Sequence, residues 1–213
     1  LEINCKAVYK EINEMLRFKY IADYVADFIK FKKLKNIILM GQCIATAIMG
    51  LVENKVSNLI LKVIFIAPYC KTYGLSKKLI RKYLPVNNVN QLIESGKIIF
   101  KKPKAFKSSA YLARCQEMVK KSLKLQKQLV FFMDQEIYNN KTFAQITKAY
   151  HQFKTPTLIC MSKQDPVLIF NKGYKELKTL MPKAKIVVFN NSKHMLFEEE
   201  PTKFVKVVKQ FLK

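Results

Sequence analysis

The chain has 213 residues, of which half are hydrophobic, with only five glycines and seven prolines. This composition excludes a disordered chain and provides for one domain with a sizeable core. The net charge is +24, and 36 of the 39 basic residues are lysines. A cationic surface attracts anions, but readers of nucleic acid favour arginine and interleaved aromatic residues, so no nucleic-acid partner is expected.

The cysteine count bears on compartment and metal binding. Five cysteines form an odd set with no short paired spacing. This predicts a reducing, cytoplasmic location rather than a disulfide framework. The sequence has no Cys-x-x-Cys or His-x-x-x-His pattern, so no metal site is expected. No signal peptide is visible in the sequence.

The first elements in chain order are a helix, a strand and a second helix. From Arg17 to Lys33 apolar residues recur in steps of three and four, which predicts an amphipathic helix packed on a core. A buried strand is expected over 36–41 and a helix over 44–55. The stretch Ile37–Val52 is uncharged for 16 residues. It is shorter than the roughly 20 residues of a membrane span, so a span is not predicted.

The junction between that strand and helix reads Gly41-Gln42-Cys43-Ile44-Ala45. Small residues two before and two after Cys43 allow a sharp turn that exposes the central side chain beside the helix N-terminus. The helix dipole there favours a thiolate. The alternative is a buried, inert cysteine at a strand end, which is a common place for this residue.

A second strand is expected over 61–67, and beyond it the pattern changes. Helical stretches dominate, and the segment 71–154 holds 18 basic residues against four acidic ones. An insertion of this size is usually a lid or a second domain. We therefore expect an α/β core formed by residues 1–70 and 151–213, with a helical lid over 71–150. The alternative reading of the charge is a solvated helical surface with a general lysine bias.

The strand–helix alternation resumes in the last quarter of the chain. A strand over 157–161 leads to Asp165-Pro166, and a helix follows at 171–180. A further strand over 185–189 runs into His194. Pro201 opens the final helix, at a position where its missing N–H has no cost.

Cys43, Asp165 and His194 each follow the carboxyl end of a predicted parallel strand. Ligands bind at that edge of open α/β sheets. A neutral imidazole can take a thiol proton, and a carboxylate can hold the imidazole in the required tautomer. Taken singly, Asp165 reads as a turn residue and His194 as a solvated loop residue. His151, the other histidine, is interpreted as structural.

These residues resemble the α/β-hydrolase superfamily, in its lid-bearing branch. Gly41–Ala45 is similar to the nucleophile elbow, Thr155–Asp165 to the acid-bearing strand, and His194-Met195 with Glu200-Pro201 to the histidine loop and final helix. The resemblance implies a parallel sheet flanked by helices, with a helical lid inserted between two strands. Cysteine stands where serine is usual, as in dienelactone-hydrolase-like members, and Ala45 replaces the usual second glycine.

The resemblance implies cleavage of an ester, thioester or related acyl bond, as in esterases and lysophospholipases, without a cofactor. Cys43 would attack the carbonyl, His194 would act as base and then acid, and Asp165 would orient it. The backbone N–H of Ile44 would stabilise the oxyanion. The implied partner is a small acyl or lipid substrate, and the basic lid also suits an anionic membrane surface.

The family's first strands and its second oxyanion donor would precede the helix at 17–33. Only 16 residues stand there, without a His-Gly-type motif, so we expect an N-terminally truncated chain. Two alternatives remain open at this stage. One is a catalytically inactive binding protein with the same fold, and the other is an acyltransferase.

Overall fold

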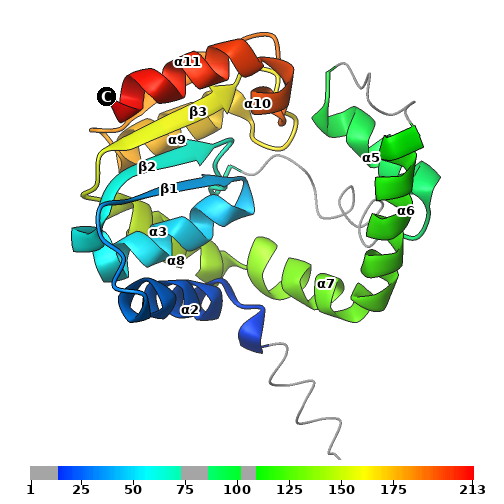
Figure 1. Cartoon of the computed structure of the whole chain (residues 1–213), viewed down its shortest axis with the longest axis horizontal. Coiled ribbons are helices and arrows are strands. Elements are labelled where there is room, and N and C mark those ends of the chain that lie inside the picture. Colours follow the sequence, from blue (N-terminus) through cyan, green and yellow to red (C-terminus); the bar gives the residue numbers. More distant parts are fainter. Residues whose placement is uncertain (1–13, 73–85, 102–108) are drawn as a thin grey trace, which may run out of the picture.

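The computed structural model of the chain describes residues 14–72, 86–101 and 109–213 (Figure 1). The strands are β1 (Ile37–Gln42), β2 (Ile60–Ile66), β3 (Thr157–Ser162) and β4 (Lys185–Phe189). The helices that precede, connect or follow the strands are α2 (Phe18–Phe31), α3 (Ile44–Val56), α8 (Asn140–His151), α9 (Phe170–Leu180), α10 (Leu196–Glu199) and α11 (Pro201–Leu212). Between β2 and α8 lie α5 (Val89–Ile99), α6 (Ser109–Lys124) and α7 (Gln126–Phe132). Short 3-10 and π-helical turns cover Ser57–Leu59 and Met133–Ile137.

The four strands form one parallel sheet in the order β1-β2-β3-β4. Each strand end lies within about two residues of the expected bounds, and so do most helix ends. Parallel neighbours need a crossover between them. Here the crossovers contain α3 between β1 and β2, helices α5 to α8 between β2 and β3, and α9 between β3 and β4.

Alternate residues of the central strands point to two different core clusters. Val63 and Phe65 pack with α2, α3, α8 and α9 on one face of the sheet. Ile64 and Ile66 pack with α10 and α11 on the other face. Figure 1 shows α11 on one side of the strands and α3 and α8 on the opposite side. Burial on both faces explains why these strands read as continuous apolar runs rather than alternating ones.

Helices α5, α6 and α7 lie to one side of the sheet, in the region expected to form the lid (Figure 1). Helix α8 differs, because its Ile146 and Tyr150 join the core cluster beneath the sheet. The boundaries of the lid at residues 71 and 150 stay a prediction. Part of that segment, 73–85 and 102–108, lies outside the described residues, as does most of the N-terminal stretch where truncation was expected.

The uncharged run Ile37–Val52 is divided between β1 and the first two turns of α3. In the described parts of the chain, no helix combines the length and apolar character needed to cross a bilayer. The run is apolar because both elements contribute side chains to the core cluster on their shared face.

Candidate active site

Cys43 occupies the single residue between β1 and α3, with backbone angles φ 52° and ψ −123°. A positive φ is strained for a non-glycine residue and persists only where neighbouring contacts enforce it. The Cys43 N–H donates to the Ile66 carbonyl at 2.9 Å. The Cys43 carbonyl accepts from the Thr46 hydroxyl at 2.6 Å and the Thr46 N–H at 3.0 Å. The sharp strand-to-helix turn expected from the sequence is therefore present and tightly held.

The small residues on either side of Cys43 allow this turn. A Cβ atom placed on Gly41 would lie 2.4 Å from the Met49 sulfur and 3.2 Å from the Ala45 Cβ. Helix α3 therefore turns back against the end of β1 at a spacing that a side chain at position 41 would obstruct. The pairing of Gly41 with Ala45 is the physical reason for the spacing seen in the sequence.

Asp165 lies just beyond β3 and is buried, with 7% of its surface exposed. Its Oδ1 accepts hydrogen bonds from the Val167 N–H at 2.8 Å and the Leu168 N–H at 3.3 Å. Its Oδ2 lies 2.9 Å from Nδ1 of His194. Asp165 thus closes a local turn with one oxygen and holds the histidine with the other.

His194 follows β4 and is 6% exposed. Burial lowers its pKa, but hydrogen bonds from its ring to Asp165 and to Cys43, with the charge of Asp165, outweigh burial and raise the pKa to about 10. The imidazole therefore lies between the Asp165 carboxylate and the Cys43 thiol. The three residues expected to meet at this edge do so.

Ile44 is the first residue of α3. The N–H groups of a first helical turn have no partner within the helix and lie at its positive end. The Ile44 N–H can therefore donate to an oxygen that develops charge beside Cys43. The second oxyanion donor was expected ahead of the helix at 17–33, where residues 1–13 are outside the described residues.

The sequence assigned no supporting role to several polar residues that hold the site. The Gln42 side-chain amide donates to the His194 carbonyl at 3.1 Å. The Ser192 hydroxyl donates to Glu200 at 2.8 Å, and the Ser162 hydroxyl donates to the Ser192 carbonyl. Gln42 could have been noticed as the polar residue ending an apolar strand, and Glu200 as part of an acidic run in a basic chain.

The described cysteines differ in their surroundings. Cys70, Cys115 and Cys160 are buried, whereas Cys43 is partly exposed. Burial raises the pKa of the Cys70 and Cys160 thiols to about 12. Within the described ranges, no group of three or more His, Cys, Asp or Glu side chains could hold a metal ion. Cys43 is thus the described thiol most open to a substrate.

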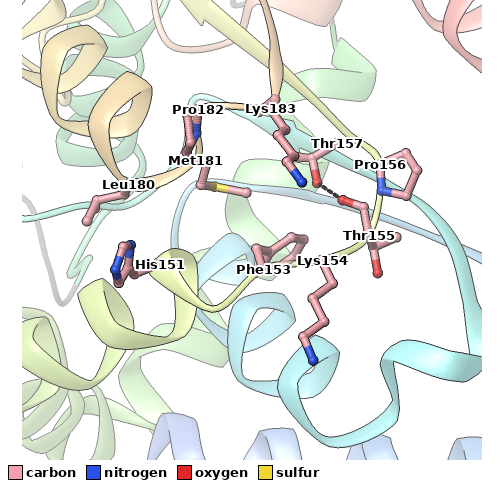
Figure 2. A pocket seen from close by; sticks show the side chains of 11 residues that line it. His151, Phe153, Lys154, Thr155, Pro156, Thr157, Leu180, Met181, Pro182 and Lys183 are labelled. Atoms are coloured by element: carbon pink, nitrogen blue, oxygen red, sulfur yellow. Dashed lines mark hydrogen bonds between the residues drawn. The ribbon is translucent and has the colours of Figure 1, made fainter.

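A pocket of about 510 Å³ lies at the end of the sheet opposite to Cys43, Asp165 and His194 (Figure 2). Its wall includes His151 at the end of α8, Thr157 at the start of β3, and Ala184 just before β4. Because the strands are parallel, this is the amino edge, whereas Cys43, Asp165 and His194 follow the carboxyl edge. A second hollow of about 890 Å³ shares His151 and continues between α8 and α9.

No protein-family profile matches the chain, and no curated protein is a significant sequence match. Solved structures do match. A serine hydrolase from Cycloclasticus zankles is 12% identical, with a TM-score of 0.72 over 92% of this chain and 71% of that chain. A bromoperoxidase from Bacillus anthracis is 15% identical, with a TM-score of 0.70 over 92% and 74%. An esterase from Exiguobacterium antarcticum is 16% identical, with a TM-score of 0.70 over 93% and 75%. The chain has the α/β-hydrolase fold.

Proposed function

We propose that the protein is a hydrolase that cleaves an ester, thioester or related acyl bond with Cys43 as its nucleophile. The observation that carries the proposal is the Asp165–His194 pair, 2.9 Å apart, together with Cys43 on the strained turn at the N-terminus of α3, close enough to the ring to help raise its pKa. Esterases and a serine hydrolase among the structural neighbours support acyl-bond cleavage as the reaction class. Fold alone does not assign an activity, so the side-chain arrangement has to support it.

The reaction proceeds through two acyl transfers. The Cys43 thiolate attacks the substrate carbonyl carbon, and the Ile44 N–H stabilises the resulting oxyanion. Collapse expels the alcohol or thiol, which takes its proton from His194, and leaves a thioester on Cys43. Water then attacks that thioester after giving a proton to His194, and the acid leaves. The raised pKa of His194 fits its role as the proton donor in the first step.

The experiment measures turnover of a short-chain aryl ester and a short-chain acyl thioester by the wild-type protein and by Cys43→Ala. A nucleophile, its histidine and the carboxylate that orients the histidine act as one unit. We therefore expect the loss of Cys43 to lower kcat/KM by a factor on the order of 10³ or more. Turnover equal to the wild type in Cys43→Ala would overturn the nucleophile assignment. Absence of turnover in the wild type itself would favour a binding protein.

The acylated residue is identified separately, because 36 lysines also react with aryl esters. Peptide mapping after brief exposure to the ester should find an acyl group on Cys43 that hydroxylamine removes. The buried Cys160 serves as the internal control and should stay unmodified. Acylation confined to lysines would indicate surface chemistry rather than catalysis.

A further inference from the structure

The end of helix α5 contacts the loop that carries the candidate histidine. We define the histidine loop as residues 190–195, between β4 and α10. The His194 backbone N–H donates to the Ile99 carbonyl at 3.1 Å. The Lys193 ammonium donates to the Lys97 carbonyl at 3.0 Å. Figure 1 shows α5 as the lid helix nearest α10. The lid and the loop therefore meet through the last turn of α5.

Glu199, the last residue of α10, links the two segments with both of its carboxylate oxygens. Oε1 accepts from the Lys101 N–H at 2.5 Å, two residues past the end of α5. Oε2 accepts from the Lys193 N–H at 2.7 Å, one residue before His194. Hydrogen bonds to an ionised carboxylate are shorter and about twice as strong as those between neutral groups. One side chain thus joins the lid backbone to the histidine loop backbone.

The remaining polar groups of His194 are held by other elements. Its carbonyl accepts from Gln42 at the end of β1, and its ring nitrogen pairs with Asp165 beyond β3. The lid, β1 and the β3–α9 loop therefore each hold a different group of this one residue. A displacement of α5 would remove one of these three constraints on His194.

We propose that Glu199 is a positioning residue through which α5 of the lid sets the orientation of His194. The inference rests on the proposed function for its catalytic consequence, but the coupling between α5 and the histidine loop is a separate property. A substrate that packs against the lid and orders α5 would thereby align His194 over Cys43, which joins substrate occupancy to catalytic geometry. A misplacement of about 1 Å at a reacting group can cost on the order of 10²-fold in rate.

The test compares Glu199→Gln with Glu198→Gln, which removes the same charge from an exposed neighbour on the same helix. A glutamine keeps one acceptor oxygen and turns an NH₂ group toward the second N–H donor. The chain has only two histidines, so imidazole NMR signals resolve His194 with His151 as the reference. We expect Glu199→Gln to shift the His194 signal and to speed amide hydrogen exchange across 89–101 and 190–195. Glu198→Gln should match the wild type in both measurements.

A second variant approaches the same contact from the lid. Lys101→Pro removes the backbone N–H that donates to Glu199 Oε1 and leaves the Glu199 side chain intact. The preceding residue, Phe100, has φ −108° and ψ 141°, which a following proline tolerates. We expect the same change in the His194 signal and the same faster exchange in the histidine loop. If both variants change the His194 signal and the exchange rates in the same way, the change cannot be due only to an effect of the Glu199 substitution on folding.

The kinetic measurement separates this proposal from the proposed function. If the wild type hydrolyses an acyl ester, kcat should fall roughly 10- to 100-fold in Glu199→Gln with little change in KM. If the wild type has no activity, the NMR and exchange measurements still decide the coupling. A His194 signal and exchange rates identical to the wild type in both Glu199→Gln and Lys101→Pro would overturn the proposal, whatever the activity.

Discussion

The two ends of the sheet each bury a carboxylate, but the two groups have different partners. At the carboxyl edge Asp165, 7% exposed, holds the ring of His194 at 2.9 Å. Toward the amino edge Glu53, 1% exposed, accepts from the backbone N–H groups of Lys154 and Thr155 and from the Thr155 hydroxyl. The partners of Glu53 are backbone N–H groups and a hydroxyl, whereas the partner of Asp165 is an imidazole, a group that can take up and release a proton. A buried carboxylate becomes a candidate for chemistry through such a partner and not through burial.

The largest effect should come from Asp165→Asn. The asparagine can keep the turn through its oxygen, but its NH₂ group then faces Nδ1 of His194 and favours the wrong tautomer. Loss of this orientation costs about 10⁴-fold in kcat in serine proteases, and we expect a fall on the order of 10³ to 10⁴ here. His151→Gln, at the other end of the sheet, is the control and should retain wild-type turnover of the aryl ester. Wild-type activity in Asp165→Asn would show that Asp165, like Glu53, has no part in the reaction.

Glu53→Ala should affect stability rather than rate. Without the carboxylate, two backbone N–H groups and a hydroxyl near the start of β3 lose their acceptor. Leaving buried donors unsatisfied costs about 1–3 kcal/mol in the free energy of unfolding. Glu53→Gln retains one acceptor oxygen and should recover most of the loss. Urea unfolding measures both variants, and a lower kcat per folded molecule in Glu53→Ala would contradict the structural role.

The proton on His194 should make stability depend on pH in a defined window. Its pKa is raised from 6.5 to about 10 in the folded protein, so the proton is bound more tightly when the chain is folded. The resulting stabilisation is complete below pH 6.5 and is lost as the pH rises through about 10. Asp165→Asn removes a principal cause of that shift. The difference in unfolding free energy between the wild type and this variant should therefore shrink between pH 6 and pH 10.5.

Taking that difference cancels the titration of lysines and tyrosines that both proteins share. The measurement is urea unfolding at closely spaced pH values. A difference that stays constant across the window would show that Asp165 does not hold the His194 proton.

The smallest effect concerns the basic lid, for which we propose an anionic membrane surface as a partner. Exposed lysines on α6 and α7 lie among exposed apolar residues such as Met118 and Leu123. Each lysine near an anionic surface contributes about 1 kcal/mol, within a Debye length of about 8 Å at physiological salt. With about one of these lysines that close to the surface at a time, replacing them by glutamine should weaken binding to anionic vesicles about fivefold. The substituted positions are Lys120, Lys121, Lys124 and Lys127.

The matched control changes the net charge by the same amount on and beside α9, away from the lid. Its positions are Lys172, Lys175, Lys178 and Lys183. Vesicle co-sedimentation at low and high salt should separate the two variants at low salt. If both bind equally, the attraction arises from the overall charge of +24 and the lid has no special part in it.

The sequence predicted the strands and the positions of the three site residues because those features are local. Apolar runs define the strands, and the residues that follow a parallel strand must lie at its carboxyl edge. The packing of α8 against α3 was not predicted, since an amphipathic stripe does not say which surface covers it. Glu199 and Gln42 were missed for a similar reason. Their partners are backbone groups of other segments, and no spacing in the sequence encodes those contacts.

The position of the lid within the chain has a consequence for folding. It separates β2 from β3, so the pairing of Ile66 with Cys160 closes a loop of more than ninety residues. The entropy cost of closing a loop grows with its length, and distant pairings slow folding. Asp165 and His194 belong to one continuous segment that begins at β3, so their contact can form before that loop closes. Cys43 can join them only when β2 docks on β3, so we expect the thiol to be the last of the three to reach the site.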